Sequence, residues 1–228
     1  MTTLQKTNGW TLDLLSAIEW RRFEELCTRL FEHKGFICKT QSHGADEGID
    51  IHLYFGKETL ALDRIVQCKA WKKKVPIEPM RAFLGTIVSA GAKRGTFVSR
   101  GGFTSDAMAF AAKNSIHTID GGQLLELISN LGPMESRILL ERITEGDYTT
   151  PTCASCGIKL VPRSVDTDKP FWGCRNWKPY NKGCNTKMFM SNEHLATLKN
   201  VAPSLTEKES AVAAGIKWGK SILQSRKR

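Results

Sequence analysis

The segment from residue 48 to residue 71, GIDIHLYFGKETLALDRIVQCKAW, constrains the fold of this chain more than any other stretch. It contains two runs of alternating apolar residues joined by a short turn, a pattern that predicts a β-hairpin. Side chains alternate between the two faces of a strand, so the apolar residues of the first run are expected on one face: Ile49, Ile51, Leu53 and Phe55. Its polar residues are expected on the other face, outside the core: Asp50, His52 and Tyr54.

The second run carries two polar residues that a buried strand normally avoids. Gln67 and Lys69 share one face by the same alternation, and the apolar residues lie opposite: Val66, Cys68 and Ala70. Pairing the two strands would bring Asp50, Gln67 and Lys69 to neighbouring positions on one surface of the sheet.

These three residue types suit a metal-dependent nuclease. Hydrolysis of a phosphodiester needs a divalent cation that neutralises phosphate charge and acidifies a bound water. Asp50 offers the hard carboxylate ligand that Mg²⁺ prefers. Lys69 can orient the attacking water or stabilise charge in the transition state, and Gln67 can position that water. Each residue taken alone is more often a solvated surface group, so the hypothesis depends on the three occurring together.

The arrangement GIDI...VQCKAW resembles the D...(E/Q)xK signature of the Mrr-like restriction endonucleases, a branch of the PD-(D/E)xK nuclease superfamily. The likeness continues through FVSRGGFTSDAMAFA and IHTIDGGQL and covers roughly residues 15 to 130. It implies restriction of foreign DNA, catalytic Mg²⁺ at Asp50 with help from the Cys68 carbonyl, and a further site acid at Glu24. The wider superfamily has an acid where this chain has Gln67. From the residues alone, Glu24 could equally be a surface acid beside the apolar stripe of its helix.

The remaining patterns predict an α/β fold with a mixed sheet in the order αββαβαβ. A first helix is expected over residues 16–34, starting with Ser16 and Glu19 in capping-box spacing and ending at Lys34-Gly35. Further helices are expected from Pro79 to Gly91, from the Thr104 cap to Lys113, and over residues 123–131. Strands are expected at GTFVS and IHTID, and the strand–helix–strand order implies a parallel crossover. We expect this nuclease domain to span residues 1–148.

Residues 149–190 contain four cysteines in a pattern typical of a structural zinc site. The predicted ligands are Cys153, Cys156, Cys174 and Cys184, and the glycine after Cys153-Ala-Ser-Cys156 lets the chain turn around the metal. A segment this short has little apolar core, so Zn²⁺ would have to drive its folding. It resembles the four-cysteine zinc ribbon of bacterial type I topoisomerases through CxxCG and FWGCRN. That resemblance implies binding of single-stranded or distorted DNA.

Basic and aromatic residues of this module are candidates for DNA contact: Arg175, Trp177, Lys178 and Lys182. Trp172 is instead expected in the core of the ribbon. The lysine run Lys72, Lys73 and Lys74 follows the hairpin, where it could grip phosphates or simply protect a solvated strand edge.

The net charge of +10 is unevenly distributed along the 228 residues. Up to residue 150 there are 19 Lys and Arg against 18 Asp and Glu, and beyond it 14 against 5. This excess favours DNA as a partner, although basic tails also serve solubility alone. Residues 191–228 are expected to form a basic helical tail.

The sequence shows no apolar run of the roughly 18 residues that a membrane span needs and no secretory signal. Cysteines in a metal pattern favour a reducing, cytoplasmic location. We expect no small-molecule cofactor, and a homodimer would supply the two active sites that double-strand cleavage commonly requires.

Three functional hypotheses follow from the sequence. The first is a Mg²⁺-dependent DNA endonuclease of Mrr-like, type IV-like restriction type. The second is a non-cleaving DNA-binding adaptor of repair or plasmid maintenance on a degenerate nuclease scaffold, which Gln67 favours. The third is an RNA-directed ribbon protein.

Overall fold

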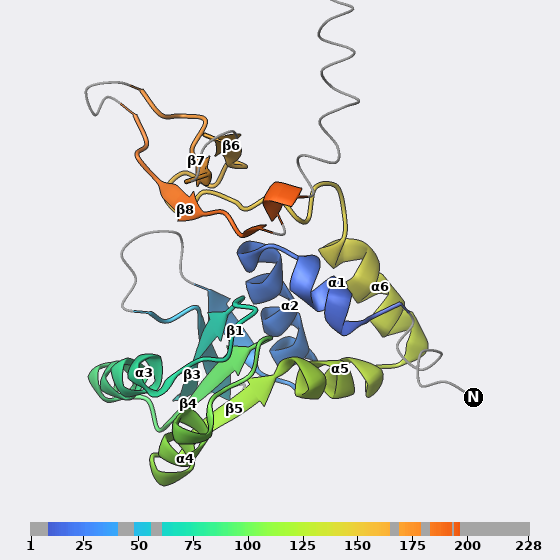
Figure 1. The fold of residues 1–228 in the computed structure, drawn as a ribbon. Helices are drawn as coiled ribbons and strands as arrows, with labels where there is room; N and C mark the ends of the chain where they lie inside the picture. The colour runs from blue at the N-terminus through green and yellow to red at the C-terminus, as the bar shows by residue number, and fades with distance from the viewer. Residues whose placement is uncertain are drawn as a thin grey trace, which may run out of the picture. The chain divides into compact units, whose positions relative to one another are not determined.

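A computed structural model describes residues 9–40, 48–55, 61–164, 169–178, 183–192 and 194–196 of the chain (Figure 1). The chain forms two compact units, residues 1–160 and residues 161–228. Among the described residues, no helix combines the length and the apolar character needed to cross a membrane.

The first unit is built on a five-stranded sheet in the order β1-β2-β3-β4-β5. Its strands are β1 (Ile37–Thr40), β2 (Ile51–Phe55), β3 (Ala61–Lys69), β4 (Arg94–Ser99) and β5 (Ile116–Asp120). The pairs β1–β2 and β2–β3 are antiparallel, whereas β3–β4 and β4–β5 are parallel. The parallel pairs are connected by helices, as a crossover requires: α3 (Ile77–Ser89) and α4 (Ser105–Lys113). The predicted mixed α/β sheet is confirmed.

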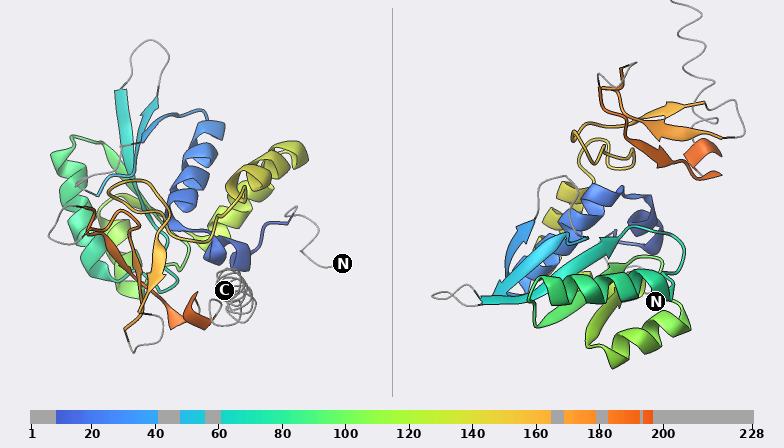
Figure 2. Two further views of the ribbon diagram at one scale, coloured as in Figure 1. Left: turned by 90° about the horizontal axis from the view of Figure 1, so that it is seen from above. Right: turned by 90° about the vertical axis from the view of Figure 1, so that its left-hand side faces the viewer.

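Helices cover both faces of this sheet (Figures 1 and 2). One face carries α3 and α4, and the other carries α1 (Leu12–Ala17), α2 (Trp20–His33), α5 (Gly121–Ser129) and α6 (Pro133–Ile143). Two apolar clusters fill the layers: one joins α2 to residues such as Val66 and Val98, and the other joins α3 and α4 to residues such as Ile65 and Phe97. Neighbouring residues of β3 and β4 therefore alternate between the two clusters, as the strand period requires.

The sequence prediction omitted one strand. β1 lies at the edge of the sheet, spans four residues and is mostly exposed, with Ile37 at 42% exposure. An edge strand with no buried face shows no apolar alternation, so its sequence gives no strand signal.

The predicted start of the first helix is wrong. The segment forms two helices, with Ile18 extended between them, and Glu19 is the N-cap of α2 rather than the third residue of a helix capped by Ser16. The end is as predicted: Lys34 is the C-cap, and Gly35 follows with φ +86°. The apolar stripe is buried except for Trp20, which is half-buried.

Smaller differences concern single positions. α5 begins at Gly121, two residues earlier than expected, because Asp120 and Gln123 form a capping box. Val88 of α3 is 73% exposed, and Phe55, expected on the apolar face of its strand, is 63% exposed. Both lie near the end of their element, where the partner layer no longer covers the side chain.

The second unit contains a three-stranded antiparallel sheet in the order β6-β7-β8. Its strands are β6 (Val161–Arg163), β7 (Phe171–Gly173) and β8 (Lys187–Phe189). Trp172 is buried at 5% exposure, as predicted, and its ring lies 5.9 Å from that of His194. Beyond residue 196 the predicted helical tail lies outside the described residues, and the domain bounds 1–148, 149–190 and 191–228 stay predictions.

Candidate functional site

The carboxylate of Asp50 lies against the backbone of β3. Its Oδ2 accepts a hydrogen bond of 2.5 Å from the backbone N–H of Cys68, and the N–H of Asp50 donates to the Val66 carbonyl at 3.0 Å. Cys68 stands between Gln67 and Lys69 in the chain. The fold therefore brings the predicted aspartate to the middle of the predicted Gln-x-Lys segment.

The expected alternation of the first run breaks at Asp50. The ladder of β2 begins only at Ile51, which pairs with Val66. Ile49 was predicted to share a face with Ile51 and Leu53, but it packs into the other apolar cluster, with α3 and α4. Because β2 begins only after Asp50, the side chain of Asp50 accepts the Cys68 N–H that a longer strand would have paired.

Gln67 is fixed by a glycine on the neighbouring segment. Gln67 is only 9% exposed. A Cβ placed on Gly48 would lie 2.7 Å from Gln67 Nε2, and Gly48 has φ +80°, a conformation that favours glycine. Glycine at position 48 therefore leaves room for the Gln67 amide beside Asp50.

Lys69 is half-buried at the carboxyl end of β3. Its Nζ lies 6.0 Å from the centre of the exposed Trp71 ring, so the ammonium group stands at the surface end of the strand. A partly buried lysine can act as a fixed cation toward a phosphate.

Glu24 comes to the same neighbourhood from α2. The pKa of the Cys68 thiol is raised well above its usual value by a hydrogen bond with the Cys27 thiol and by burial. The negative charges of the Asp50 and Glu24 carboxylates raise it further. Both carboxylates are thus close enough to Cys68 to act on its charge, and they flank it from the hairpin and from α2.

The lysine run of residues 72–74 is exposed and follows directly after this segment. Its backbone is held in place: a Cβ on Gly101 would lie 2.6 Å from the Lys73 carbonyl, and the next residue, Val75, donates to the Gly102 carbonyl at 2.9 Å. Strand β3 is internal to the sheet, so these lysines do not protect an edge strand.

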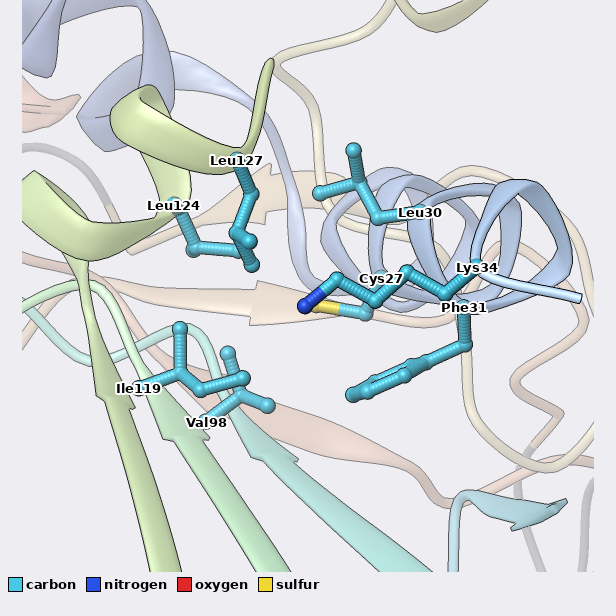
Figure 3. Close-up of a pocket in the computed structure, with 8 residues that line it drawn as sticks. All are labelled: Cys27, Leu30, Phe31, Lys34, Val98, Ile119, Leu124 and Leu127. Carbon is cyan, nitrogen blue, oxygen red and sulfur yellow. The ribbon is translucent and has the colours of Figure 1, made fainter. Parts of the chain in front are cut away.

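A small cavity lies apart from this group, between α2, α5 and strands β4 and β5 (Figure 3). It measures about 10 Å³, and Leu30, Val98, Ile119 and Leu124 are among the side chains that line it. A space of this size holds at most one water and offers it little polar contact, so the cavity is a packing defect and no ligand site.

The four predicted zinc ligands come together. The Sγ atoms of Cys153, Cys156, Cys174 and Cys184 all lie within 4.8 Å of one another. Four thiolates bound to Zn²⁺ at ~2.3 Å would be ~3.8 Å apart, so the cluster has the dimensions and the donor set of a structural zinc site. The Cys174 sulfur also accepts the Asn176 N–H at 3.4 Å, a contact that stabilises a thiolate.

The first cysteine loop is tied to α2 by a carboxylate that sequence reasoning misassigned. Glu19 is 5% exposed, and its carboxylate accepts from the Thr152 N–H at 3.2 Å, the Thr152 hydroxyl at 2.8 Å and Lys159 Nζ at 3.2 Å. It also caps α2 by accepting the Arg21 N–H at 3.1 Å. Thr152 and Lys159 are more than 130 residues away in sequence, and no local pattern predicts their contact with Glu19.

The predicted DNA-contacting residues of the ribbon are on its surface where the structure describes them. Arg175 and Lys178 are exposed, and Trp177 is 52% exposed. Lys182 lies outside the described residues.

The Mrr catalytic-domain family, described as a restriction endonuclease, matches residues 15–128, half of the chain. The chain belongs to this restriction endonuclease family. A curated relative is the type IV methyl-directed restriction enzyme EcoKMrr of Escherichia coli strain K12, 36% identical over 106 residues. The match covers 45% of this chain and 34% of the relative, so this chain spans about a third of that protein's length.

Solved structures give a weaker likeness. The MspJI restriction endonuclease in complex with a 27-mer oligonucleotide is 19% identical with a TM-score of 0.39, over 57% of this chain and 33% of that one. The DNA modification-dependent restriction endonuclease AspBHI is 15% identical with a TM-score of 0.43, over 63% and 42% of the two chains. At these identities the likeness concerns the fold alone.

Proposed function

We propose that the protein is a Mg²⁺-dependent DNA endonuclease of Mrr-like, type IV-like restriction type that hydrolyses phosphodiester bonds. The observation that supports the proposal is the 2.5 Å hydrogen bond from the Cys68 N–H to the Asp50 carboxylate, because Cys68 stands between Gln67 and Lys69 in the chain. Membership of the restriction endonuclease family supports the same reaction class.

Asp50 is the proposed Mg²⁺ ligand, with Glu24 as a second acid and the Cys68 carbonyl as a third oxygen. A carboxylate can accept a hydrogen bond and coordinate a cation at once, and the Cys68 bond fixes how Asp50 presents its oxygens. When bound, Mg²⁺ supplies charge neutralisation for the phosphate and acidity for a coordinated water.

Lys69 holds a positive charge where the pentavalent phosphate develops negative charge, and this stabilises the transition state. Gln67, held beside Gly48, orients the attacking water with its amide. The exposed lysines 72–74 bind flanking phosphates and set the register of the DNA backbone.

Zn²⁺ bound by Cys153, Cys156, Cys174 and Cys184 is proposed to stabilise the fold of the cysteine module, residues 149–190. Arg175, Trp177, Lys178 and Lys182 then contact DNA from that module. We also propose that the protein is cytoplasmic and forms a homodimer with two active sites.

Nicking of supercoiled plasmid with and without Mg²⁺ tests the reaction. Asp50→Asn and Lys69→Met should each reduce nicking by at least about 100-fold, the scale on which loss of one transition-state contact reduces a rate. Asp106→Asn and Lys113→Met change the same residue types at exposed positions of α4 and should leave nicking unchanged. Nicking that survives both site substitutions would refute the proposal. Methylated and unmethylated plasmids, compared in the same assay, would show whether modification directs cleavage.

A second candidate function is a DNA-binding adaptor that does not cleave. The nearly buried, neutral Gln67 favours it, because an acid at this position would add a second charge for the metal. Specific DNA binding by the wild-type chain without any Mg²⁺-dependent nicking would establish this function in place of the first.

A further inference from the structure

Two of the four predicted zinc ligands lie in a loop that belongs to the first unit. This first cysteine loop runs from Thr152 to Lys159 and contains Cys153 and Cys156. Its two ends form an antiparallel bridge. Inside the loop the Cys153 N–H donates to the Ile158 carbonyl at 2.7 Å. The backbone that carries both thiols is therefore closed on itself by hydrogen bonds.

A carboxylate of α2 binds both ends of this loop. Glu19 Oε1 accepts from the Thr152 hydroxyl at 2.8 Å and from Lys159 Nζ at 3.2 Å, and Oε2 accepts the Thr152 N–H at 3.2 Å. The indole N–H of Trp20 donates to the Thr152 carbonyl at 2.8 Å. The residue directly before Cys153 is thus bonded through its N–H, its hydroxyl and its carbonyl, and at 3% exposure it is shielded from competing water.

Glu19 is itself fixed by the first unit. Its carboxylate caps α2 by accepting the Arg21 N–H at 3.1 Å, and its backbone N–H donates to the Tyr148 carbonyl at 2.8 Å. Its carbonyl accepts the N–H of Phe23, whose ring is fully buried in the apolar cluster on this face of the sheet. These contacts involve no thiolate, so the packing of α2 makes them without a metal.

An anchored loop changes the energetics of metal binding. A loop that zinc must order loses conformational freedom on binding, and that cost is subtracted from the affinity for the metal. A loop already held in its bound conformation avoids most of this cost. The sequence predicts that zinc orders the whole cysteine module, because the module has little apolar core. The contacts of Glu19 make that prediction too strong for the first pair of ligands.

We infer that Glu19 is a positioning residue of the zinc site, and that its carboxylate preorganises Cys153 and Cys156 for Zn²⁺ from a helix outside the cysteine module. The inference rests on the proposed zinc site and deepens it, because it names the part of the first unit on which the affinity for zinc depends. The chain accordingly reaches its full zinc affinity only when α2 is folded and packed.

The test measures the zinc affinity of the full-length, reduced protein by competition. Zinc-loaded protein is titrated with a chelator of known zinc affinity, at constant pH and below the thermal transition of each variant. Glu19→Gln should weaken zinc binding by roughly 10- to 100-fold, the range typical for loss of a partner that orients a metal ligand. Thr152→Val removes only the hydroxyl contact and leaves the cap at Arg21 intact. It should weaken zinc binding by roughly 2- to 10-fold, the equivalent of one hydrogen bond.

Two controls separate positioning from general stability. Thr104→Val makes the same substitution at the N-cap of α4, where the hydroxyl accepts the Ala107 N–H at 3.3 Å. Ile87→Ala truncates a buried side chain of α3 and creates a cavity. Both helices lie on the opposite face of the sheet from α2 (Figures 1 and 2). Both substitutions should destabilise the first unit without changing its zinc affinity.

A cobalt spectrum distinguishes a positioning residue from a ligand. Co²⁺ bound in place of Zn²⁺ absorbs visible light according to its ligands and their geometry. The spectra of wild-type protein and Glu19→Gln should coincide at saturating Co²⁺, because the same four thiolates bind the metal. A changed spectrum would contradict the inference, since Glu19 would then affect the ligand set itself.

Equal zinc affinity for wild-type protein and Glu19→Gln would overturn the inference and leave the zinc site intact. A loss of the same size for Ile87→Ala would overturn it as well, because zinc affinity would then follow stability alone. A wild-type chain that binds no zinc would refute the proposed zinc site and this inference together. The proposed nuclease reaction is judged separately, by plasmid nicking.

Discussion

The buried carboxylate of Glu19 gives the sharpest test of how the first cysteine loop is held. Glu19→Gln keeps the shape of the side chain but removes its charge and turns one acceptor oxygen into a donor. Lys159 then loses its ion-pair partner. Oε2 accepts both the Thr152 N–H and the Arg21 N–H, and Oε1 accepts the Thr152 hydroxyl and the Lys159 ammonium group, so the introduced amide NH₂ faces donors whichever oxygen it replaces. A hydrogen bond to a charged group contributes ~1.5–3 kcal/mol.

The net cost is smaller than the sum of these bonds. The Lys159 side chain is 30% exposed and can be solvated by water, and neutralising a buried carboxylate regains part of its desolvation energy. We expect Glu19→Gln to lower the free energy of unfolding by about 3 kcal/mol, which corresponds to a fall in Tm of roughly 6–12 °C.

Thermal unfolding followed by circular dichroism at constant zinc measures this change. Glu32→Gln is the matched control on the same helix, because Glu32 is exposed and forms an exposed ion pair with Arg29, whose loss should cost less than ~0.5 kcal/mol. In a double-mutant cycle, Lys159→Met should cost less in the Glu19→Gln background than in the wild type. A melting temperature for Glu19→Gln equal to that of Glu32→Gln would refute the reasoning.

Three further predictions concern single residues. Gly48→Ala should destabilise the protein by about 1–3 kcal/mol and reduce nicking, since it combines positive φ with a clash at Gln67; thermal melts and plasmid assays measure both effects. Burial lowers the pKa of His52 below its usual value. At mildly acidic pH this histidine is therefore protonated more often in the unfolded chain than in the folded chain. The free energy of unfolding should therefore fall as the pH drops through this region, and His52→Gln should flatten that slope in denaturant titrations. Cys174→Ser should abolish zinc binding in elemental analysis, whereas Cys38→Ser, outside the cluster, should not.

Elements with local signals were predictable from the sequence. The Thr104 cap and the end of α4 at Lys113 are as expected, because the cap bonds to Ala107 only three residues away and the helix needs no distant partner to begin. The parallel crossover followed from the strand–helix–strand order, which leaves few topologies.

Features that depend on distant partners were not predictable. The sequence pattern predicts Glu19 inside a helix, because its contacts with Thr152 and Lys159 involve residues far away in the chain. The alternation around Asp50 predicts a longer strand, and only the Cys68 N–H explains why the ladder stops at Ile51. The predicted hairpin brings Asp50 to the backbone of the Gln67–Lys69 segment, where it accepts from the Cys68 N–H, whereas no sequence pattern indicates that Gly48 makes space for the Gln67 amide.

The contact between Asp50 and position 68 uses a main-chain donor, which every amino acid except proline possesses. Natural variants of this protein can therefore exchange Cys68 for another small apolar residue that fills the same space against α2 without moving the aspartate. Proline alone would delete the donor and leave the acid without its anchor. Evolutionary drift at residue 68, between two chemically constrained neighbours, is what this geometry permits.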